Sequence, residues 1–235
     1  MDRFVLDRAA RLVDDAKAAY ERYEFHTVAW RLLEFATTDL SALWCDVRKD
    51  ALYVLSAGDP ARRSAQTTAL KLAETIALLL NPICPFTAEE IWESLPGRAG
   101  SHPSLETYET LELPRLSDAG SAAWSHLETL RDAVLKELEP LRRSGAVGTS
   151  AQATADVPRT QELDADMAAA GIDGAALAEF FVLPQVTLIS PDQALAVRPA
   201  EGTKCPRCWQ VRRDGDADGL CGRCRIVIEA KPPAV

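Results

Sequence analysis

The chain has 235 residues, and its 26 Lys and Arg against 35 Asp and Glu leave a formal net charge of −9. Apolar residues make up 47% and charged residues 26%, a balance that excludes a wholly disordered chain. The acidic charge also argues against a uniformly basic nucleic-acid binder, because phosphate contacts come from Lys and Arg.

No segment of the sequence is typical of a membrane span or a secretory signal. The longest apolar stretch, residues 76–80, is far shorter than the ~20 residues that cross a bilayer. Residues 1–4 do not form a basic region followed by an apolar block. We therefore expect a cytoplasmic protein of one or two domains with no membrane partner.

The N-terminal part of the chain has the periodicity of a helical bundle. Apolar residues recur at three- and four-residue steps through residues 5–23 and 28–47, which predicts two amphipathic helices. A Gly-Asp-Pro turn at residues 58–60 interrupts the pattern. A third helix is predicted at residues 62–80, apolar on most sides near its end, as in a central bundle helix.

Two prolines end this third helix, because proline cannot donate a backbone hydrogen bond and disfavours helix in the residue before it. Thr87 and Glu90 then have the spacing of a capping box, and Phe86 and Ile91 that of a hydrophobic staple. These signals predict a short fourth helix that ends near Pro96.

The second half of the chain mixes helix and strand patterns. Residues 98–118 are predicted to form an irregular connector, and an amphipathic helix follows at residues 118–143. The remaining predicted elements are strands at residues 151–157, 180–183 and 186–189 and a short helix at residues 161–170. A small α/β domain is therefore expected after the helical bundle.

Six cysteines in a chain with no export signal indicate thiols or a metal site rather than disulfides. Cys45 and Cys84 are isolated among apolar neighbours, and we expect both to be buried core residues.

The other four cysteines form two Cys-x-x-Cys pairs separated by 12 residues: Cys205, Cys208, Cys221 and Cys224. Four thiolates complete the tetrahedral shell of zinc and leave no position open for a substrate, which predicts one structural Zn²⁺. A redox pair, the alternative, would need a single Cys-x-x-Cys in a βαβ pattern, which neither pair has.

The charge around these cysteines differs from the rest of the chain. Residues 198–225 contain seven basic and four acidic side chains, a net charge of +3, so the remainder carries −12. Trp209 directly follows the first pair, where an indole can stack on an unpaired base. From the local sequence alone, packing of Trp209 in the small core of the module is an equal alternative.

Four stretches together resemble the C-terminal part of bacterial isoleucyl-tRNA synthetases. They are residues 39–53, which contain Arg48-Lys-Asp-Ala-Leu-Tyr53; Arg62-Arg-Ser-Ala-Gln-Thr67; Pro82-Ile-Cys-Pro-Phe-Thr-Ala-Glu-Glu-Ile-Trp92; and Lys204-Cys-Pro-Arg-Cys-Trp209 with Cys221-Gly-Arg-Cys224. The resemblance spans nearly the whole chain, and its last motif separates the isoleucyl enzymes from the valyl and leucyl relatives that share the helical domain.

The resemblance implies a mainly α fold in which an anticodon-binding helical bundle precedes a small α/β junction domain and a zinc ribbon or knuckle. The expected parts are the bundle at residues 1–97, the connector at 98–118, the junction domain at 119–200 and the zinc module at 201–235. The implied partner is the anticodon stem-loop of isoleucine tRNA, which the chain would position for aminoacylation.

By the same resemblance, zinc ligation falls on the four paired cysteines and RNA contact on Arg207 and Trp209. Lys204, Arg142 and Arg143 are further candidates for RNA contact, although the last two also suit helix-end charges that complement a helix dipole.

The chain lacks the catalytic part of such enzymes. Their His-Ile-Gly-His and Lys-Met-Ser-Lys-Ser type signatures are missing, as is the editing domain, so we assign no catalytic residue and expect no ligase activity from this chain alone. ATP would bind only in the absent catalytic domain, and a synthetase body is a possible protein partner. The alternative is a free-standing, zinc-containing RNA-binding, DNA-binding or adaptor protein derived from a synthetase tail.

Overall fold

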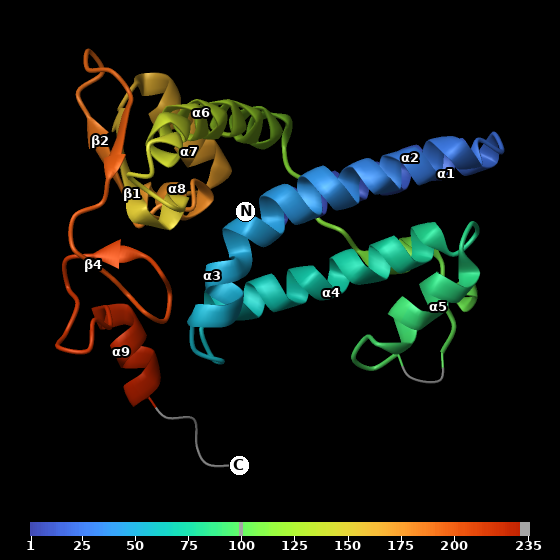
Figure 1. Cartoon of the computed structure of the whole chain (residues 1–235). Helices are drawn as coiled ribbons and strands as arrows, with labels where there is room; N and C mark the ends of the chain where they lie inside the picture. Colours follow the sequence, from blue (N-terminus) through green and yellow to red (C-terminus); the bar gives the residue numbers. More distant parts are fainter. Residues whose placement is uncertain (99–100, 231–235) are drawn as a thin grey trace. The chain divides into compact units, whose positions relative to one another are not determined.

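The computed structural model describes residues 1–98 and 101–230, so small parts of the predicted connector and zinc module lie outside the described residues. The chain divides into two compact units (Figure 1). The first comprises Met1–Leu52 and Ala57–Leu116, and the second comprises Tyr53–Ser56 and the chain from Ser117 onward. Among the described residues, no helix is long and apolar enough to cross a membrane.

The first unit is helical, as the periodicity predicts. Its elements are α1 (Asp2–Glu21), α2 (Phe25–Glu34), the π-helical η1 (Phe35–Cys45), α3 (Asp46–Val54, whose last two residues belong to the second unit), α4 (Pro60–Leu80), α5 (Pro85–Glu93) and the 3₁₀ turns η2 (Pro103–Leu105) and η3 (Tyr108–Leu111). The predicted helix at residues 28–47 is thus continuous but changes from α to π geometry in its middle. Helix α4 begins at Pro60 because the Asp59 carboxylate accepts a hydrogen bond from the backbone N–H of Ala61 at 2.8 Å.

One buried carboxylate ties four elements of this unit together. Asp2 at the start of α1 accepts hydrogen bonds from Arg48 Nε (2.8 Å) and Nη2 (2.6 Å), from Trp44 Nε1 (3.1 Å) and from Ser64 Oγ (2.5 Å). Burial raises the pKa of Asp2, but the Arg48 charge and these hydrogen bonds outweigh it and hold the pKa below its ordinary value. The start of α1 is therefore fixed against η1, α3 and α4.

The segment before Ser117 packs on α1. Arg115 donates to the Ala10 carbonyl oxygen, and the Leu116 N–H donates to Asp7 Oδ1, both at 3.0 Å. Leu111 is buried in the core of the first unit. The irregular segment is thus part of the first unit up to Leu116.

The predicted capping box and hydrophobic staple at the fourth helix are wrong. Helix α5 begins at Pro85 with Cys84 as its N-cap, so Thr87 lies inside the first turn and caps nothing. Phe86 is 85% exposed and makes no hydrophobic staple. The preset φ angle of Pro85 explains the earlier start, because it suits the first helical position.

The prediction that Cys45 and Cys84 are buried is wrong, since both are exposed. Cys45 follows Trp44, and it is the Trp44 indole that takes the buried position on this turn. Cys84 lies in the turn between α4 and α5. Apolar neighbours in the sequence therefore did not predict the burial of either thiol.

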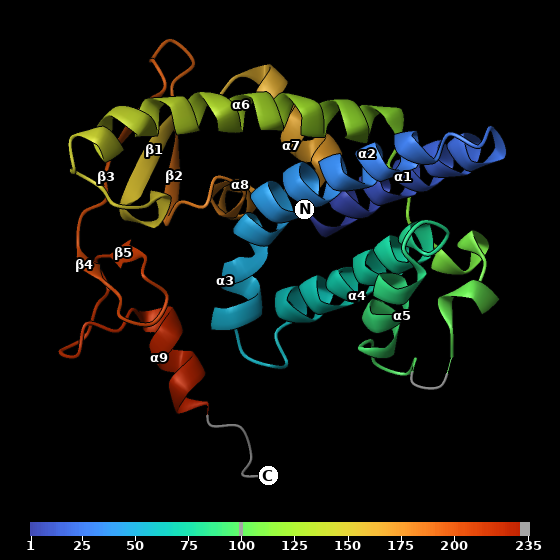
Figure 2. The same ribbon diagram turned by 45° about the vertical axis from the view of Figure 1, so that its right-hand side comes forward.

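The second unit begins with a three-stranded sheet covered by helices. Its elements are α6 (Asp118–Arg143), η4 (Ser150–Gln152), β1 (Ala153–Pro158), α7 (Gln161–Ala170), α8 (Gly174–Phe180), β2 (Gln185–Ile189) and β3 (Ala196–Pro199). The strand order is β2–β1–β3, with β1 parallel to β2 and antiparallel to β3. Helix α6 packs along this sheet beside α7 (Figure 2), and Trp124 on α6 meets Phe180 edge to face at 5.3 Å.

The strand predicted at residues 180–183 is wrong, whereas the strands at residues 151–157 and 186–189 are confirmed as β1 and β2 within a residue or two. Phe180 and Phe181 are buried at the C-terminal end of α8, and Val182 follows in the left-handed region at φ 59°. A short buried apolar run has the same composition in a strand and in a helix end, so periodicity could not separate them.

A small module ends the second unit. It consists of the antiparallel pair β4 (Thr203–Lys204) and β5 (Val211–Arg212) and the helix α9 (Gly222–Glu229). Gly202 leads into β4 with φ +125°, and a Cβ atom there would lie 2.1 Å from the Arg212 carbonyl oxygen. Only glycine fits this close approach of two backbones.

We expect Asp2→Asn to lower the free energy of unfolding of the first unit by about 3–5 kcal/mol at pH 7, because the buried Arg48 charge loses its counterion. The folded-state pKa of Asp2 lies below its unfolded value, so this stability is present above the ordinary pKa of 3.8 and is lost as pH falls through the folded-state pKa. Urea titrations between pH 7 and pH 3 measure both effects. Asp46→Asn, which removes an exposed pair with Lys49, is the control and should cost under about 1 kcal/mol; equal losses would contradict the prediction.

We expect Gly202→Ala to open the β4–β5 pair, because the backbone conformation alone costs alanine about 1–3 kcal/mol and the clash adds to this cost. The measurement is hydrogen exchange of the Cys205 amide, which donates to the Gln210 carbonyl oxygen at 2.9 Å. Gly215→Ala in the same module is the control, since its Cβ would meet nothing closer than 3.6 Å. Unchanged exchange in Gly202→Ala would show that the close approach is not required.

Candidate metal centre and nucleic-acid surface

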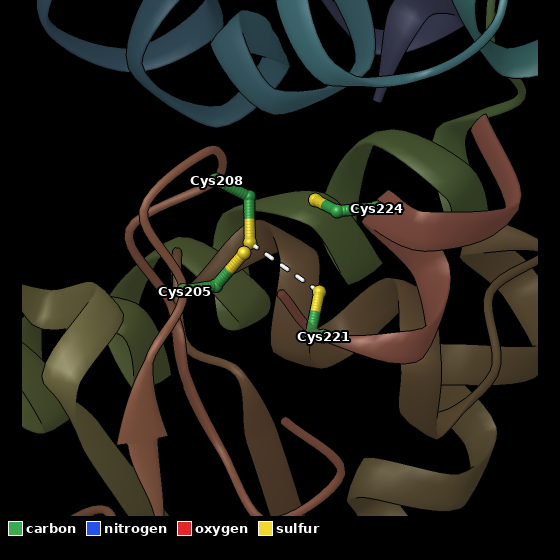
Figure 3. A group of neighbouring side chains, drawn as sticks. All are labelled: Cys205, Cys208, Cys221 and Cys224. Carbon is green, nitrogen blue, oxygen red and sulfur yellow. Dashed lines mark hydrogen bonds between the residues drawn. The ribbon is translucent and has the colours of Figure 1, made fainter. Parts of the chain in front are cut away.

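The four paired cysteines meet in the small module. Cys205 and Cys208 lie in the hairpin loop between β4 and β5, whereas Cys221 is the N-cap of α9 and Cys224 lies in its first turn. The four sulfur atoms all lie within 4.8 Å of one another, and their side chains converge on one point (Figure 3). This is the only group of three or more potential metal-ligating side chains found among residues 1–98 and 101–230.

The dimensions of the cluster fit a tetrahedral metal ion. A Zn–S bond of about 2.3 Å places neighbouring ligand sulfurs about 3.8 Å apart at tetrahedral corners. The Cys208 and Cys221 sulfurs lie 3.8 Å apart (dashed line in Figure 3). Four sulfur donors fill the shell of such an ion, so the geometry suits a structural metal rather than one that binds a substrate.

The surroundings of the sulfurs shift the pKa values of the cysteines in different directions. Burial opposes ionisation of Cys205, but backbone N–H groups of Cys208, Cys221 and Arg207 hydrogen-bond to it and lower its pKa to about 6. Burial raises the pKa of Cys224 to about 12 and also raises that of Cys208. Without a metal, these last two side chains therefore remain thiols at neutral pH, and a bound cation must displace their protons.

Two aspartates hold the second cysteine pair in place. Asp214 Oδ2 accepts the Gly222 N–H at 2.9 Å, and Asp216 Oδ1 accepts the N–H groups of Asp218 (3.0 Å) and Leu220 (2.9 Å). Neither aspartate is predicted from the sequence to support the site. The signal was the alternation of Asp with small residues from Asp214 onward, which favours turns stabilised by side-chain hydrogen bonds.

Trp209 is a surface residue. Its side chain is 66% exposed, which excludes the alternative that it packs in the core of the module. Its backbone lies in the left-handed region at φ 63°, where a bulky residue is strained, and its N–H donates to the Cys205 carbonyl oxygen at 2.9 Å. Lys204 on β4, which precedes the same hairpin loop, is also exposed.

The other predicted RNA-contact residues are placed differently. Arg207 is half-buried, and its Nη1 donates to the Cys224 sulfur at 3.5 Å, so its guanidinium lies against the cysteine cluster. Arg142 and Arg143 are exposed in the last turn of α6, where Arg143 pairs with Glu139 at 3.7 Å. No contact given for the described residues joins these two arginines to the cysteine module.

Comparison with known proteins gives a family match for the helical part of the chain. Residues 2–157 match the family model described as the anticodon-binding domain of tRNA ligase. The chain is 35% identical over 238 residues to the isoleucine–tRNA ligase of Bordetella avium, and 34% identical over 254 residues to that of Shewanella amazonensis. These alignments cover 95% and 100% of this chain but 25% and 27% of the two ligases.

The chain thus spans about a quarter of the length of the curated relatives it matches. Its family match covers α1 through β1, well over half of the chain. The resemblance read from the four sequence stretches is confirmed: the chain belongs to the family of anticodon-binding domains of tRNA ligases.

Proposed function

We propose that this chain is the tRNA-binding part of an isoleucine–tRNA ligase and positions the anticodon stem-loop of isoleucine tRNA for aminoacylation. The observation that carries the proposal is the 34–36% identity to isoleucine–tRNA ligases along 95–100% of the chain. The exposed Trp209 beside four converging cysteines supports it, because the surface of this module offers an aromatic face for an unpaired base.

The parts of the chain have separate roles in this proposal. The helical bundle, residues 1–97, binds the anticodon stem, and residues 98–118 connect it to the junction domain at residues 119–200. The terminal module, residues 201–235, reaches the anticodon loop. The rest of the ligase contains the catalytic domain with its ATP site and the editing site, and it is the protein partner in this proposal. This chain alone therefore does not aminoacylate tRNA. Its compartment is the cytoplasm, where tRNA is charged.

The metal in this proposal is a single Zn²⁺ bound by Cys205, Cys208, Cys221 and Cys224. The ion supplies coordination energy that folds and holds the module, and it takes no part in catalysis. The module needs that energy because it has little apolar core. Among the described residues, Val54 is the one buried residue other than cysteine in the cluster around the sulfurs.

RNA contact falls mainly on Trp209, whose exposed indole can stack on a base of the anticodon loop. Lys204 lies close to it in sequence, at the start of the same hairpin loop, where its ammonium can meet a phosphate. Arg142 and Arg143, exposed at the end of α6, are further phosphate contacts, and Arg207 remains a contact only if its guanidinium leaves the Cys224 sulfur.

For the metal, we expect about one zinc per chain in protein purified under reducing conditions without a chelator, by elemental analysis. Cys205→Ser should lose most of this zinc, because the buried sulfur is one of the four ligands. Cys84→Ser, at an exposed cysteine outside the cluster, should retain it. A wild-type protein with far less than one zinc per chain would contradict the ligand assignment.

For the RNA, we expect gel-shift titrations to show tighter binding of isoleucine tRNA than of another tRNA. Trp209→Ala should weaken this binding by about 1–3 kcal/mol, the value of one stacked base. Leu105→Ala is the control and should bind as the wild type does, because Leu105 is 82% exposed but lies in the connector segment.

Zinc content of Trp209→Ala should equal that of the wild type, which separates loss of stacking from loss of the module. Equal binding of both tRNAs, or of neither, would contradict the proposed role. Binding to a ligase body without any tRNA would instead favour the adaptor alternative.

A further inference from the structure

The two cysteine pairs share a feature beyond their ligands. Each has the form Cys-x-Arg-Cys, with Arg207 in the first pair and Arg223 in the second. The two arginines thus occupy equivalent positions, one in the β4–β5 loop and one in the first turn of α9. Both side chains are half-buried, unlike the exposed arginines Arg213 and Arg225 of the same module.

Each arginine acts on a sulfur of the opposite pair. Arg207 Nη1 donates to the sulfur of Cys224 at 3.5 Å. Burial raises the pKa of Cys208, and a hydrogen bond from the Arg223 side chain opposes this shift. The acceptor in both cases is the last cysteine of the other pair. The contacts are therefore reciprocal, so the hairpin loop and α9 are linked in both directions.

The remaining arginines of residues 202–230 have oxygen partners. Arg212 donates to Gln210 Oε1 at 2.9 and 2.6 Å, Arg213 pairs with Glu201, and Arg225 lies 3.9 Å from Asp216. Among the contacts given for this described segment, only Arg207 and Arg223 bring a guanidinium to a sulfur. Of the five arginines in this segment, two thus have a sulfur partner and three have oxygen partners.

The net charge of a zinc ion with four thiolates favours two cationic side chains beside the sulfurs. Zn²⁺ with four thiolates has a net charge of −2, and the sulfurs of Cys205, Cys221 and Cys224 are buried, so water cannot fully compensate it. Two guanidinium groups supply +2 at the sulfurs, and hydrogen bonds from charged donors are stronger than neutral ones. Groups in the second coordination shell of a metal tune its binding in this way.

We infer that Arg207 and Arg223 form a reciprocal pair of positioning residues that neutralises the zinc–tetrathiolate centre and slows loss of its metal. This inference rests on the zinc assignment made above. It gives Arg207 a role inside the protein in the absence of any tRNA. It also gives a role to Arg223, which is not among the site residues predicted from the sequence.

The test measures zinc release from the whole, tRNA-free chain into an excess of a chromogenic chelator. Removing a group that supports a metal ligand usually costs about 10–100-fold in metal affinity. We expect Arg207→Gln and Arg223→Gln to show this loss as release of zinc about 10–100-fold faster than from the wild type. Arg225→Gln removes the same charge one residue after Cys224 without touching a sulfur, and its release rate should stay within about twofold of the wild type.

A second readout is the rate of alkylation of Cys208, the most exposed of the four thiols, which should rise in the same two variants and not in Arg225→Gln. Arg207→Lys guards against a simple folding defect, because it keeps the positive charge. This variant should retain zinc better than Arg207→Gln, and equally fast release from both would overturn charge neutralisation as the cause.

The outcomes separate the two assignments. Wild-type protein without zinc would overturn the metal assignment and the arginine pair with it. A zinc-loaded wild type whose Arg207→Gln and Arg223→Gln variants release zinc at the Arg225→Gln rate would overturn the arginine pair alone. Faster release from both variants, with Arg225→Gln unchanged and Arg207→Lys slower than Arg207→Gln, would establish the pair.

Discussion

Four sulfur atoms held within 4.8 Å of one another set the constraint on which the C-terminal module depends. As thiolates they repel one another, and as buried thiols they are weak hydrogen-bond partners, so a divalent cation is the group that makes their convergence favourable. Three features serve this convergence: the close backbone approach at Gly202 before β4, the Asp214 hydrogen bond to the start of α9, and the arginines Arg207 and Arg223. In the proposed function, the module is thus organised around the coordination shell of its metal rather than around an apolar core.

The first unit meets a related problem, a buried charge, with protein groups alone. Asp2 is enclosed by the Arg48 guanidinium, the Trp44 indole and the Ser64 hydroxyl, which satisfy the carboxylate with hydrogen bonds. Its large apolar core then needs no metal, and helices such as α1 and α4 pack through many apolar side chains. Acid therefore acts on the first unit through Asp2, whereas a chelator acts on the terminal module.

Periodicity predicted the helices of the first unit because an amphipathic stripe repeats over many turns, and the match at α1, α4 and α6 shows how far that signal reaches. It failed where one or two residues decide the outcome. Helix α5 begins at Pro85, earlier than the capping-box pattern predicts. The left-handed turn at Val182 ends α8 where a strand is predicted. The cysteine spacing predicted which sulfurs meet, but not that Arg207 and Arg223 would face them, because side-chain direction depends on the relative placement of the hairpin loop and α9.

Charge counting from sequence has the same limit. Residues 198–225 carry +3 when the cysteines are counted as neutral, but with the proposed Zn²⁺ bound, the four thiolates and the ion would add −2 and leave only +1. Two of the seven basic side chains face sulfur, and others pair with Glu201 and Asp156. Little cationic surface then remains for phosphate on this module. The proposed recognition by the exposed Trp209 would then rest on stacking, which suits an unpaired loop base better than a duplex whose bases are already stacked.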